Sequence, residues 1–161
     1  MRLYRIKQEY IDYLRTEEPK VLENKNERRP YIGIILFINN ITYYVPLSSP
    51  KNKYKTMKNT KDFHKIAGGV YGAINFNKMI PVPPSCVIRF DFNNEKDTSY
   101  KMLLFNQYSE LSSLEDTIKE KSKNLYKLFH SNDQDLTFAD KRVKDRCCNF
   151  TLLEEMCKKY K

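Results

Sequence analysis

The sequence has few glycines and no long hydrophobic segment. Only four of its 161 residues are glycine, which argues against a collagen-like or low-complexity disordered chain. Its longest apolar run, residues 31–38, is far too short to cross a bilayer as a helix. The first residues are charged from Arg2 and lack the apolar centre of a secretory signal. We therefore expect a single globular domain over residues 1–161 that works in the cytoplasm and does not enter a membrane.

Residues that typically bind metals are also few. The two histidines, His64 and His130, lie far in sequence from the cysteines, and no cysteine pair has a CxxC spacing. Asp91, Glu95 and Asp97 are neighbours in sequence, but strand alternation and loops do not bring them together in an obvious way. We expect reduced, mostly buried thiols, no metal site and no cofactor. The four cysteines are Cys86, Cys147, Cys148 and Cys157.

Positive charge is abundant and unevenly spread. The chain carries 29 lysines and arginines against 20 acidic residues, a formal net charge of +9. Residues 51–65 alone hold six lysines and a single acidic residue, Asp62. Clustering of this kind indicates a polyanionic partner such as a nucleic acid. The alternative, a solvated lysine-rich surface without a partner, stays open on charge alone.

The strongest local pattern lies at residues 31–55. The apolar run 31–38 and the β-rich run 41–45 are joined by Asn39-Asn40, two residues that tolerate positive φ, which predicts a β-hairpin. The segment Pro46-Leu47-Ser48-Ser49-Pro50-Lys51 follows the second strand, and we expect it to be a loop braced by proline at both ends. Such a loop would present two hydroxyls and a cation, just before a lysine-rich run that contains Tyr54.

The remaining patterns predict strands in the first half of the chain and helices in the second. Further strands are expected at residues 1–7, 73–82 and 86–92, and helices at 8–16, from 98 to about 111, at 112–130 and at 152–160. A capping box at Ser112-Ser113 is expected to open the third of these helices. Residues 68–72 are a turn cluster, and residues 142–148 a short strand or turn. Together these elements predict an α+β fold with an antiparallel sheet.

The serine loop and its neighbours carry side chains that RNA cleavage needs. Attack of a ribose 2′-hydroxyl on the adjacent phosphate requires orientation, neutralisation of the developing charge and help with proton transfer, but no metal. Lys51 is the candidate for charge stabilisation, and Ser49 and Ser48 are the candidates for hydrogen bonds to phosphate or 2′-hydroxyl. Arg29 would add a second charge. The alternatives are an inactive Ser-Ser-Pro-Lys loop and an ordinary loop arginine.

Other side chains near this loop are candidates for holding RNA. Tyrosine rings can stack on bases, and lysines can contact phosphates. Tyr31 and Tyr43 can equally pack within the hairpin, and His64 is either a general acid or a partly buried packing residue. The candidate RNA-binding residues are Arg28, Tyr31, Lys53, Tyr54, Lys55, Lys58 and His64.

Five groups of short motifs follow one another along nearly the whole chain. They are Leu3-Tyr4-x-Ile6 with Tyr10-Ile11-x-Tyr13-Leu14, Tyr31-Ile32-Gly33-Ile34 with Val45-Pro46-Leu47-Ser48-Ser49-Pro50-Lys51, NFNKMIPV at 75–82, YKMLLFNQ at 100–107 and CNFTLLEE at 148–155. Each motif is weak alone, but the ordered set resembles the type III toxin–antitoxin endoribonucleases of the ToxN and AbiQ family.

The resemblance implies a sequence-specific, metal-independent endoribonuclease toxin of a phage-defence system, leaving 2′,3′-cyclic phosphate and 5′-hydroxyl ends. It also implies a compact, twisted antiparallel sheet or partial barrel, similar to MazF and Kid, surrounded by helices. The implied partner is a repeat-derived RNA antitoxin, expected to be a pseudoknot, which the toxin cuts from a precursor and binds in a cyclic protein–RNA assembly. Cellular or phage mRNA would be the substrate.

Carried over by motif, Ser49 matches the key serine of this family and Lys51 its lysine. Ser48 replaces a threonine and keeps the hydroxyl, whereas Arg29 stands where a lysine is common and keeps the charge but not the shape. A tyrosine often found shortly before that lysine has no counterpart, because Lys25 occupies the area. Two alternatives remain: a non-catalytic basic RNA-binding module, and a structural protein with a lysine-rich surface.

Overall fold

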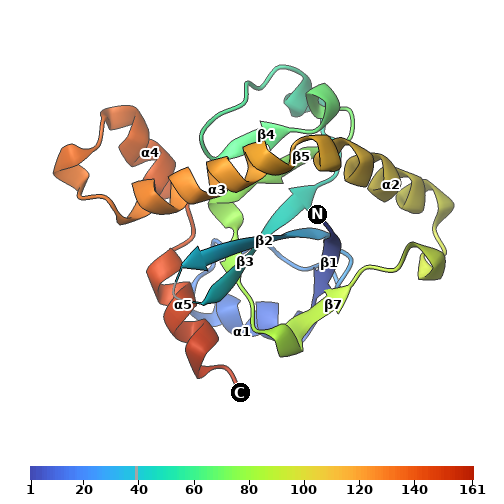
Figure 1. Ribbon diagram of the computed structural model, residues 1–161, viewed down its shortest axis with the longest axis horizontal. Helices are drawn as coiled ribbons and strands as arrows, with labels where there is room; N and C mark the ends of the chain where they lie inside the picture. The colour runs from blue at the N-terminus through green and yellow to red at the C-terminus, as the bar shows by residue number, and fades with distance from the viewer. Residues whose placement is uncertain (39) are drawn as a thin grey trace.

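An antiparallel sheet surrounded by helices forms the centre of the molecule, which confirms the predicted α+β class (Figure 1). The computed structural model describes residues 1–38 and 40–161. In Figure 1, α3 crosses in front of the sheet and α1 lies behind it. The strands are β1 (Leu3–Ile6), β2 (Tyr31–Ile38), β3 (Ile41–Ser48), β4 (Phe63–Lys65), β5 (Ala73–Asn75), β6 (Ile80–Pro81) and β7 (Val87–Arg89). The α-helices are α1 (Gln8–Glu17), α2 (Thr98–Ser113), α3 (Glu115–His130), α4 (Phe138–Arg146) and α5 (Phe150–Lys159).

Strand β3 connects the two parts of the sheet. The strand order is β4-β5-β3-β2-β1-β7, and β6 pairs with β3 beside this path. β3 pairs with β2, with β6 at Tyr43 and Tyr44, and with β5 at Leu47 and Ser48. Because β5 takes up the end of β3, the strand runs through to Ser48. The expectation that residues 46–48 form a loop is therefore wrong, and only residues 49–51 connect the strand to the next turn.

The predicted hairpin is formed by β2 and β3. Residues 31–34 pair with residues 46–43, and the register shifts before Ile38 meets Ile41. Asn40 has a φ of 59°, the left-handed conformation that such a turn requires. Asn39, the other predicted turn residue, lies outside the described residues. Gly33 lets β1 pack closely on β2, because a Cβ there would lie 2.7 Å from the ring of Tyr4.

Two of the other expected strands are shorter than predicted. Residues 73–82 form β5 and β6 with a 3-10 turn at Phe76–Lys78 between them. This turn breaks the strand because the backbone N–H of Asn77 bonds to the carbonyl of Asp62, at 3.3 Å. β7 is limited to three residues by 3-10 turns at Pro84–Cys86 and Phe92–Asn94.

Two expectations about the helical half are also corrected. Residues 142–146 belong to α4, whose N-cap Thr137 accepts a hydrogen bond from the backbone N–H of Asp140 at 3.1 Å. Ser112 and Ser113 end α2, and their hydroxyls donate to carbonyls of the preceding turn, so no capping box opens α3. Asp97 caps α2 and Asn149 caps α5, each with its side chain accepting a hydrogen bond from a backbone N–H of the first turn.

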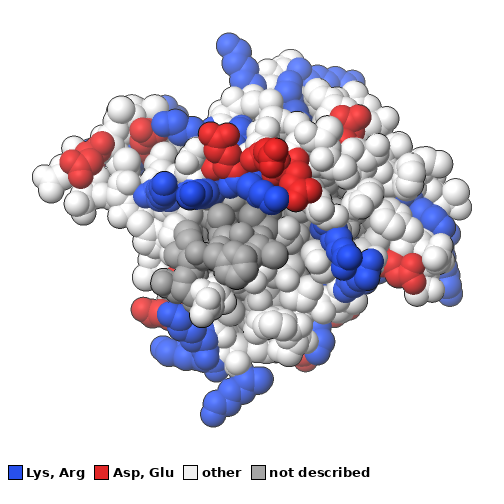
Figure 2. All heavy atoms as spheres, viewed as in Figure 1, with Lys and Arg blue, Asp and Glu red and all other residues white. Residues whose placement is uncertain are grey.

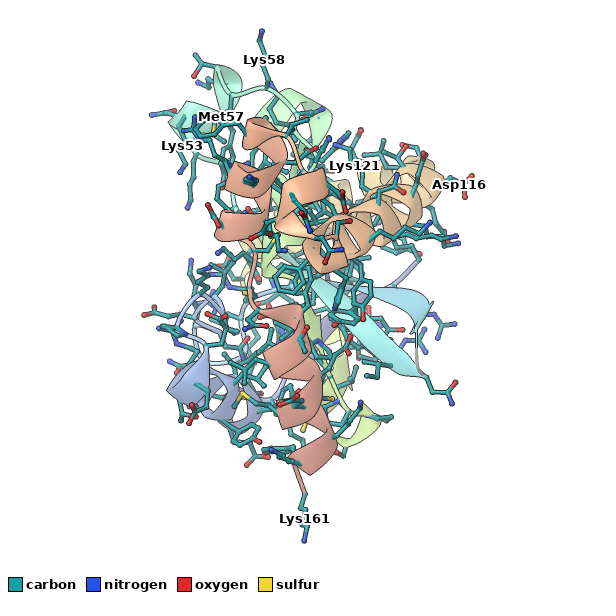
Figure 3. The ribbon with its side chains drawn as sticks, turned by 90° about the vertical axis from the view of Figure 1, so that its left-hand side faces the viewer. Lys53, Met57, Lys58, Asp116, Lys121 and Lys161 are labelled. Atoms are coloured by element: carbon teal, nitrogen blue, oxygen red, sulfur yellow. The ribbon has the colours of Figure 1, made fainter. Side chains whose placement is uncertain are left out.

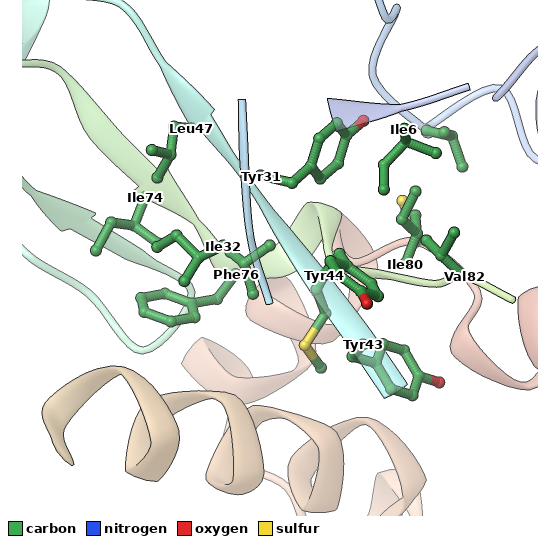
Figure 4. Packing of buried hydrophobic residues seen from close by; sticks show 14 of the residues in the cluster. Ile6, Tyr31, Ile32, Tyr43, Tyr44, Leu47, Ile74, Phe76, Ile80 and Val82 are labelled. Atoms are coloured by element: carbon green, nitrogen blue, oxygen red, sulfur yellow. The ribbon is translucent and has the colours of Figure 1, made fainter. Parts of the chain in front are cut away.

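The core lies between the sheet and the helices, as Figure 4 shows for the residues around the hairpin. Tyr43 and Tyr126 both donate to the carboxylate of buried Glu154 on α5, at 2.6 and 2.8 Å. This arrangement satisfies an acid that would otherwise be costly to bury. All four cysteines are free, and three are buried, as expected. None of the described helices combines the length and apolarity that a membrane span requires.

Candidate active site

A pocket of about 430 Å³ opens where the chain before β2 meets the end of β3. The eight lining residues include three cations and no acid. The lining residues are Lys25, Asn26, Arg28, Arg29, Pro30, Leu47, Ser49 and Tyr100. The structure thus brings Ser49 together with Arg28 and Arg29, all predicted site residues, in one positively charged hollow.

Arg29 is held in this pocket by backbone carbonyls. Its Nε donates to the carbonyl of Glu23 at 2.7 Å, and its Nη1 donates to the carbonyl of Leu47 at 3.3 Å. The backbone N–H of Leu47 in turn bonds to the carbonyl of Pro30, at 2.9 Å. Because its bonding partners are neutral carbonyls, Arg29 keeps its net positive charge beside Ser49.

A left-handed turn at residues 25–27 forms one wall of the pocket. Lys25, Asn26 and Glu27 have φ values of 54°, 53° and 63°, and each non-glycine residue in this region costs about 1–2 kcal/mol. Reciprocal bonds between Gln8 and Glu27, at 3.0 and 3.4 Å, tie the turn to the start of α1. Strain of this kind persists only where the surrounding structure enforces it, and it concentrates at functional sites.

Lys25 and Asn26 were not predicted as site residues. The turn contains no glycine or proline, and Asn26, a residue type that tolerates the left-handed region, does not by itself indicate a pocket. The other indication was the position of Lys25 in place of a family tyrosine.

Tyr100 is another lining residue, which was expected within a helix but not predicted as a site residue. It lies in the first turn of α2, where its hydroxyl donates to the carbonyl of Arg28. The Arg28 guanidinium lies 5.4 Å from the centre of the Tyr100 ring and 3.9 Å from the carboxylate of Asp97. Burial raises the pKa of Tyr100 above its ordinary value, so the phenol stays protonated at neutral pH.

Ser48 and Ser49 differ sharply in their surroundings. Ser48 is buried at the end of β3, and its Oγ accepts a hydrogen bond from the side-chain amide of Asn75. Ser49 is exposed at the pocket. Gly72 packs directly against this backbone: it has a φ of 96°, and a Cβ there would lie only 1.9 Å from the carbonyl oxygen of Ser48. The turn cluster predicted at residues 68–72 therefore supports the serine pair.

Lys51 is exposed and lies outside the lining of this pocket. It precedes the 3-10 turn at Asn52–Lys55, and its Nζ lies 5.9 Å from the centre of the Tyr54 ring. The structure thus places Ser49, rather than Lys51, among the arginines.

The lysine-rich segment after Lys51 is well exposed, except for its tyrosine. Lys53 and Lys58 project from the end of the molecule that lies opposite Lys161, and Lys55 is also exposed (Figure 3). Tyr54 is only 3% exposed and packs against Phe63. Positive charge also occurs elsewhere, since Figure 2 shows a row of Lys and Arg along α3 beside acidic side chains.

Three predicted RNA contacts have surroundings that favour packing. Tyr31 is 1% exposed in the core and Tyr54 is buried, so neither ring has a free face for a base. The structure therefore corrects these two assignments to packing roles. His64 lies half-buried in β4, and burial, followed by nearby Lys121, lowers its pKa. A histidine that is neutral at pH 7 is a poor general acid, which favours the packing alternative for His64 as well.

Among the described residues, no three His, Cys, Asp or Glu side chains gather in a way that could hold a metal ion. Asp91, Glu95 and Asp97 instead bond to separate partners. Asp91 accepts from Asn93 and Asn94, and Glu95 binds Arg5 at 2.7 Å. Asp97 accepts from the backbone N–H of Tyr100 at 2.9 Å. These contacts agree with the expectation that the carboxylates do not converge.

Comparison with known proteins gives a consistent result over the whole chain. Residues 2–158 match the family described as toxin ToxN of type III toxin–antitoxin systems. The endoribonuclease ToxN of Bacillus thuringiensis subsp. kurstaki is 34% identical over 99% of this chain and 84% of its own length.

Two solved structures resemble this fold at high coverage. One, from work on selective toxin inhibition by a non-coding RNA pseudoknot, has a TM-score of 0.87 at 33% identity, over 99% of this chain and 96% of that one. The other, the lactococcal anti-phage endoribonuclease AbiQ, has a TM-score of 0.79 at 27% identity, over 98% and 95% of the two chains. This chain belongs to the ToxN family of toxins from type III toxin–antitoxin systems.

Proposed function

We propose that this endoribonuclease toxin cleaves RNA in the pocket that contains Ser49, by attack of the 2′-hydroxyl on the adjacent phosphate. The reaction would be metal-independent and sequence-specific, and would leave a 2′,3′-cyclic phosphate and a 5′-hydroxyl. The observation that carries this proposal is the composition of the pocket: three cations, an exposed hydroxyl and no acid. Such a site attracts a phosphodiester and stabilises the additional negative charge of the transition state.

The proposed roles follow from the contacts. Arg29, fixed by two carbonyls, would bind a non-bridging oxygen of the scissile phosphate. Ser49 would position the phosphate or the 2′-hydroxyl, with Ser48 holding the backbone through Asn75. Lys51 would approach the developing charge from outside the pocket, once the substrate is in place. Arg28, Lys53, Lys55 and Lys58 would contact phosphates of the flanking strand.

The family assignment also suggests the biological partners. The structural relative described with a non-coding RNA pseudoknot supports an RNA antitoxin for this toxin too. We propose that the toxin cuts this antitoxin from a repetitive precursor, binds it in a cyclic assembly, and cleaves cellular or phage mRNA in the cytoplasm when released. We also propose that the antiparallel sheet of this chain is related to the sheets of the MazF and Kid toxins.

The decisive experiment compares Ser49→Ala and Lys51→Ala with matched controls. Purified variants would be assayed on the antitoxin precursor, with and without EDTA, and by growth arrest in cells. Removal of one stabilising group is expected to lower the rate about 100-fold or more, with EDTA having no effect on the wild type. Ser109→Ala and Lys158→Ala, exposed positions on α2 and α5, are the controls.

Two results would contradict the proposal. Undiminished cleavage by both variants would end the assignment of the site. RNA binding by the wild type without any cleavage would instead support the non-catalytic RNA-binding module.

A further inference from the structure

A second and larger hollow, of about 970 Å³, lies between α2 and the sheet edge formed by β1 and β7. Its floor is aromatic. Phe92 lies at the centre, with ring centroids of Phe90, Tyr108 and Phe105 at 4.8, 6.1 and 6.3 Å. All three pairs meet edge to face, so in each pair the edge of one ring lies against the face of the other.

Part of this aromatic surface is unusually exposed. Phe105 and Met102, three residues apart on α2, are each 57% exposed. Large apolar side chains grouped at the mouth of a hollow are uncommon on a protein surface without a binding role.

The rim of the hollow is positively charged. Arg2, Arg89 and Lys101 line it, and no carboxylate of the described residues lies within ion-pair distance of any of them. The one acid in the lining, Glu95, is already bound by Arg5. Figure 2 shows Lys and Arg side chains gathered on the side of the molecule where α2 and β7 lie.

The hollow and the candidate active site share the first turns of α2. Tyr100 lines the active-site pocket, whereas Thr98 and Lys101 line the aromatic hollow. Neighbouring residues of the same helical turn therefore line the two sites.

We infer that this hollow is a second RNA subsite, which holds unpaired bases of the substrate strand as it leaves the active site. Exposed aromatic faces inside a ring of unpaired cations are the combination that binds single-stranded nucleic acid. The exposed ring of Phe105 stacks on a base, with half-buried Phe92 behind it in the hollow. Arg2, Arg89 and Lys101 bind the phosphates of the same strand. A second copy of this chain is a poor occupant, because its net charge of +9 would meet a positive rim. The inference rests on the proposed cleavage of RNA and names a further part of that site.

The test compares a long single-stranded RNA with an oligonucleotide of a few residues that fills only the active-site pocket. Phe105→Ala removes a ring that is more than half exposed, and Phe138→Ala, which removes a 78% exposed ring on α4, is the matched control. Loss of one stacking contact corresponds to about 5- to 150-fold in affinity. We expect Phe105→Ala to raise the KM of the long RNA by about 5- to 150-fold, and to lower kcat/KM for the long RNA but not for the short one. Phe138→Ala should have the same KM and kcat/KM as the wild type with both RNAs.

A spectroscopic readout separates stacking from a general loss of structure. With 2-aminopurine in the flank of the long RNA, binding to the wild type should quench the fluorescence, and Phe105→Ala should abolish this quenching. Lys101→Gln should weaken binding of the long RNA while leaving the quenching of the bound form intact.

Several outcomes would overturn the inference. Wild-type affinity and quenching in Phe105→Ala would rule out the stacking role. An effect confined to the antitoxin RNA would reassign the hollow from substrate to antitoxin. A change in sedimentation coefficient without a change in RNA binding would assign it to a second copy of the chain. If the wild type cleaves neither RNA, yet Phe105→Ala still weakens binding of the long one, the subsite stands and the proposed catalytic function fails.

Discussion

At the scale of single residues, Arg29 shows how this site keeps an arginine charge available. Its guanidinium bonds to two backbone carbonyls on different segments, and none of the eight described residues that line the pocket is acidic. Carbonyls fix the planar group without neutralising it. A lysine, with a single ammonium on a flexible stem, cannot reach both carbonyls in the same way.

We therefore expect Arg29→Ala to lower the cleavage rate about 100-fold, the usual cost of removing one hydrogen-bond donor to the transition state. The cleavage rate of Arg29→Lys should lie between those of Arg29→Ala and the wild type. Single-turnover cleavage with saturating enzyme measures this directly. Arg142→Ala, at an exposed arginine on α4, is the control, and urea midpoints verify folding. Equal activity of Arg29→Ala and the wild type would exclude Arg29 from the reaction.

Asp62 is the residue whose charge most clearly affects stability. It is 2% exposed, and Arg146 binds both of its oxygens at 2.9 Å, which joins α4 to the segment before β4. Burial alone would raise the pKa of Asp62, but the bonds from Arg146 and Thr60 outweigh it and hold the pKa below its ordinary value of 3.8. The native state therefore favours the ionised carboxylate.

Because the folded pKa is lowered, the stabilisation is complete above about pH 4 and is lost as the pH falls through the folded value. Asp62→Asn should cost about 1.5–3 kcal/mol at pH 7, the range for hydrogen bonds to a charged group. This difference from the wild type should shrink toward pH 2. Urea unfolding at both pH values tests it, and a difference that is constant with pH would contradict the assignment. Asp135→Asn, at an exposed acid, is the control.

At the scale of elements, the glycine turn at residues 68–72 is a support for the serine pair. Gly72 lies against the Ser48 carbonyl, and Gln107 of α2 fixes the turn by donating to the carbonyl of Tyr71 at 2.7 Å. Helix α2 thereby supports both sides of the site, since Tyr100 also bonds to Arg28.

Gly72→Ala is expected to reduce cleavage strongly, because its Cβ would lie 1.9 Å from the Ser48 carbonyl and must displace it. Gly68→Ala is a matched control: its φ is also positive, at 65°, but nothing lies within 4 Å of the added Cβ. Both variants bear the left-handed backbone cost of about 1–2 kcal/mol. Only Gly72→Ala should lose more stability than this backbone cost. Its cleavage rate should also fall at least tenfold. Equal activity of the two variants would show that the turn does not position the serines.

At the scale of the whole molecule, more than half of the net charge of +9 comes from residues 51–65, with six lysines and one acid. Lys53 and Lys58 of this segment project from one end of the molecule, while Lys161 marks the other (Figure 3). Counterion release then makes RNA binding depend on salt in proportion to the phosphates contacted.

Replacing Lys53, Lys55 and Lys58 together by glutamine should reduce the slope of log K against log salt by about 2, at about 0.7 per lost phosphate contact. The matched control replaces Lys158, Lys159 and Lys161, at the C-terminal end. Both triple variants lose three positive charges. Equal slopes would therefore show that RNA binding depends only on the net charge of the protein and not on the position of the lysines. Binding would be measured in the Ser49→Ala background, so that cleavage does not interfere.

The sequence by itself determined the class of fold, the hairpin, most of the helices and the family, because these depend on local periodicity and on motifs carried in order along the chain. It also predicted Ser49, Arg28 and Arg29, close to the hairpin in sequence, as site residues; the structure brings them into one pocket, and their roles in cleavage stay predictions. Only the tertiary structure decided that Ser48 is buried in β3, that Tyr31 and Tyr54 are packing residues, and that Lys25 and Tyr100 line the pocket. Strand pairing with β5, a left-handed turn without glycine and the docking of α2 all depend on contacts between distant segments, which local sequence patterns do not encode.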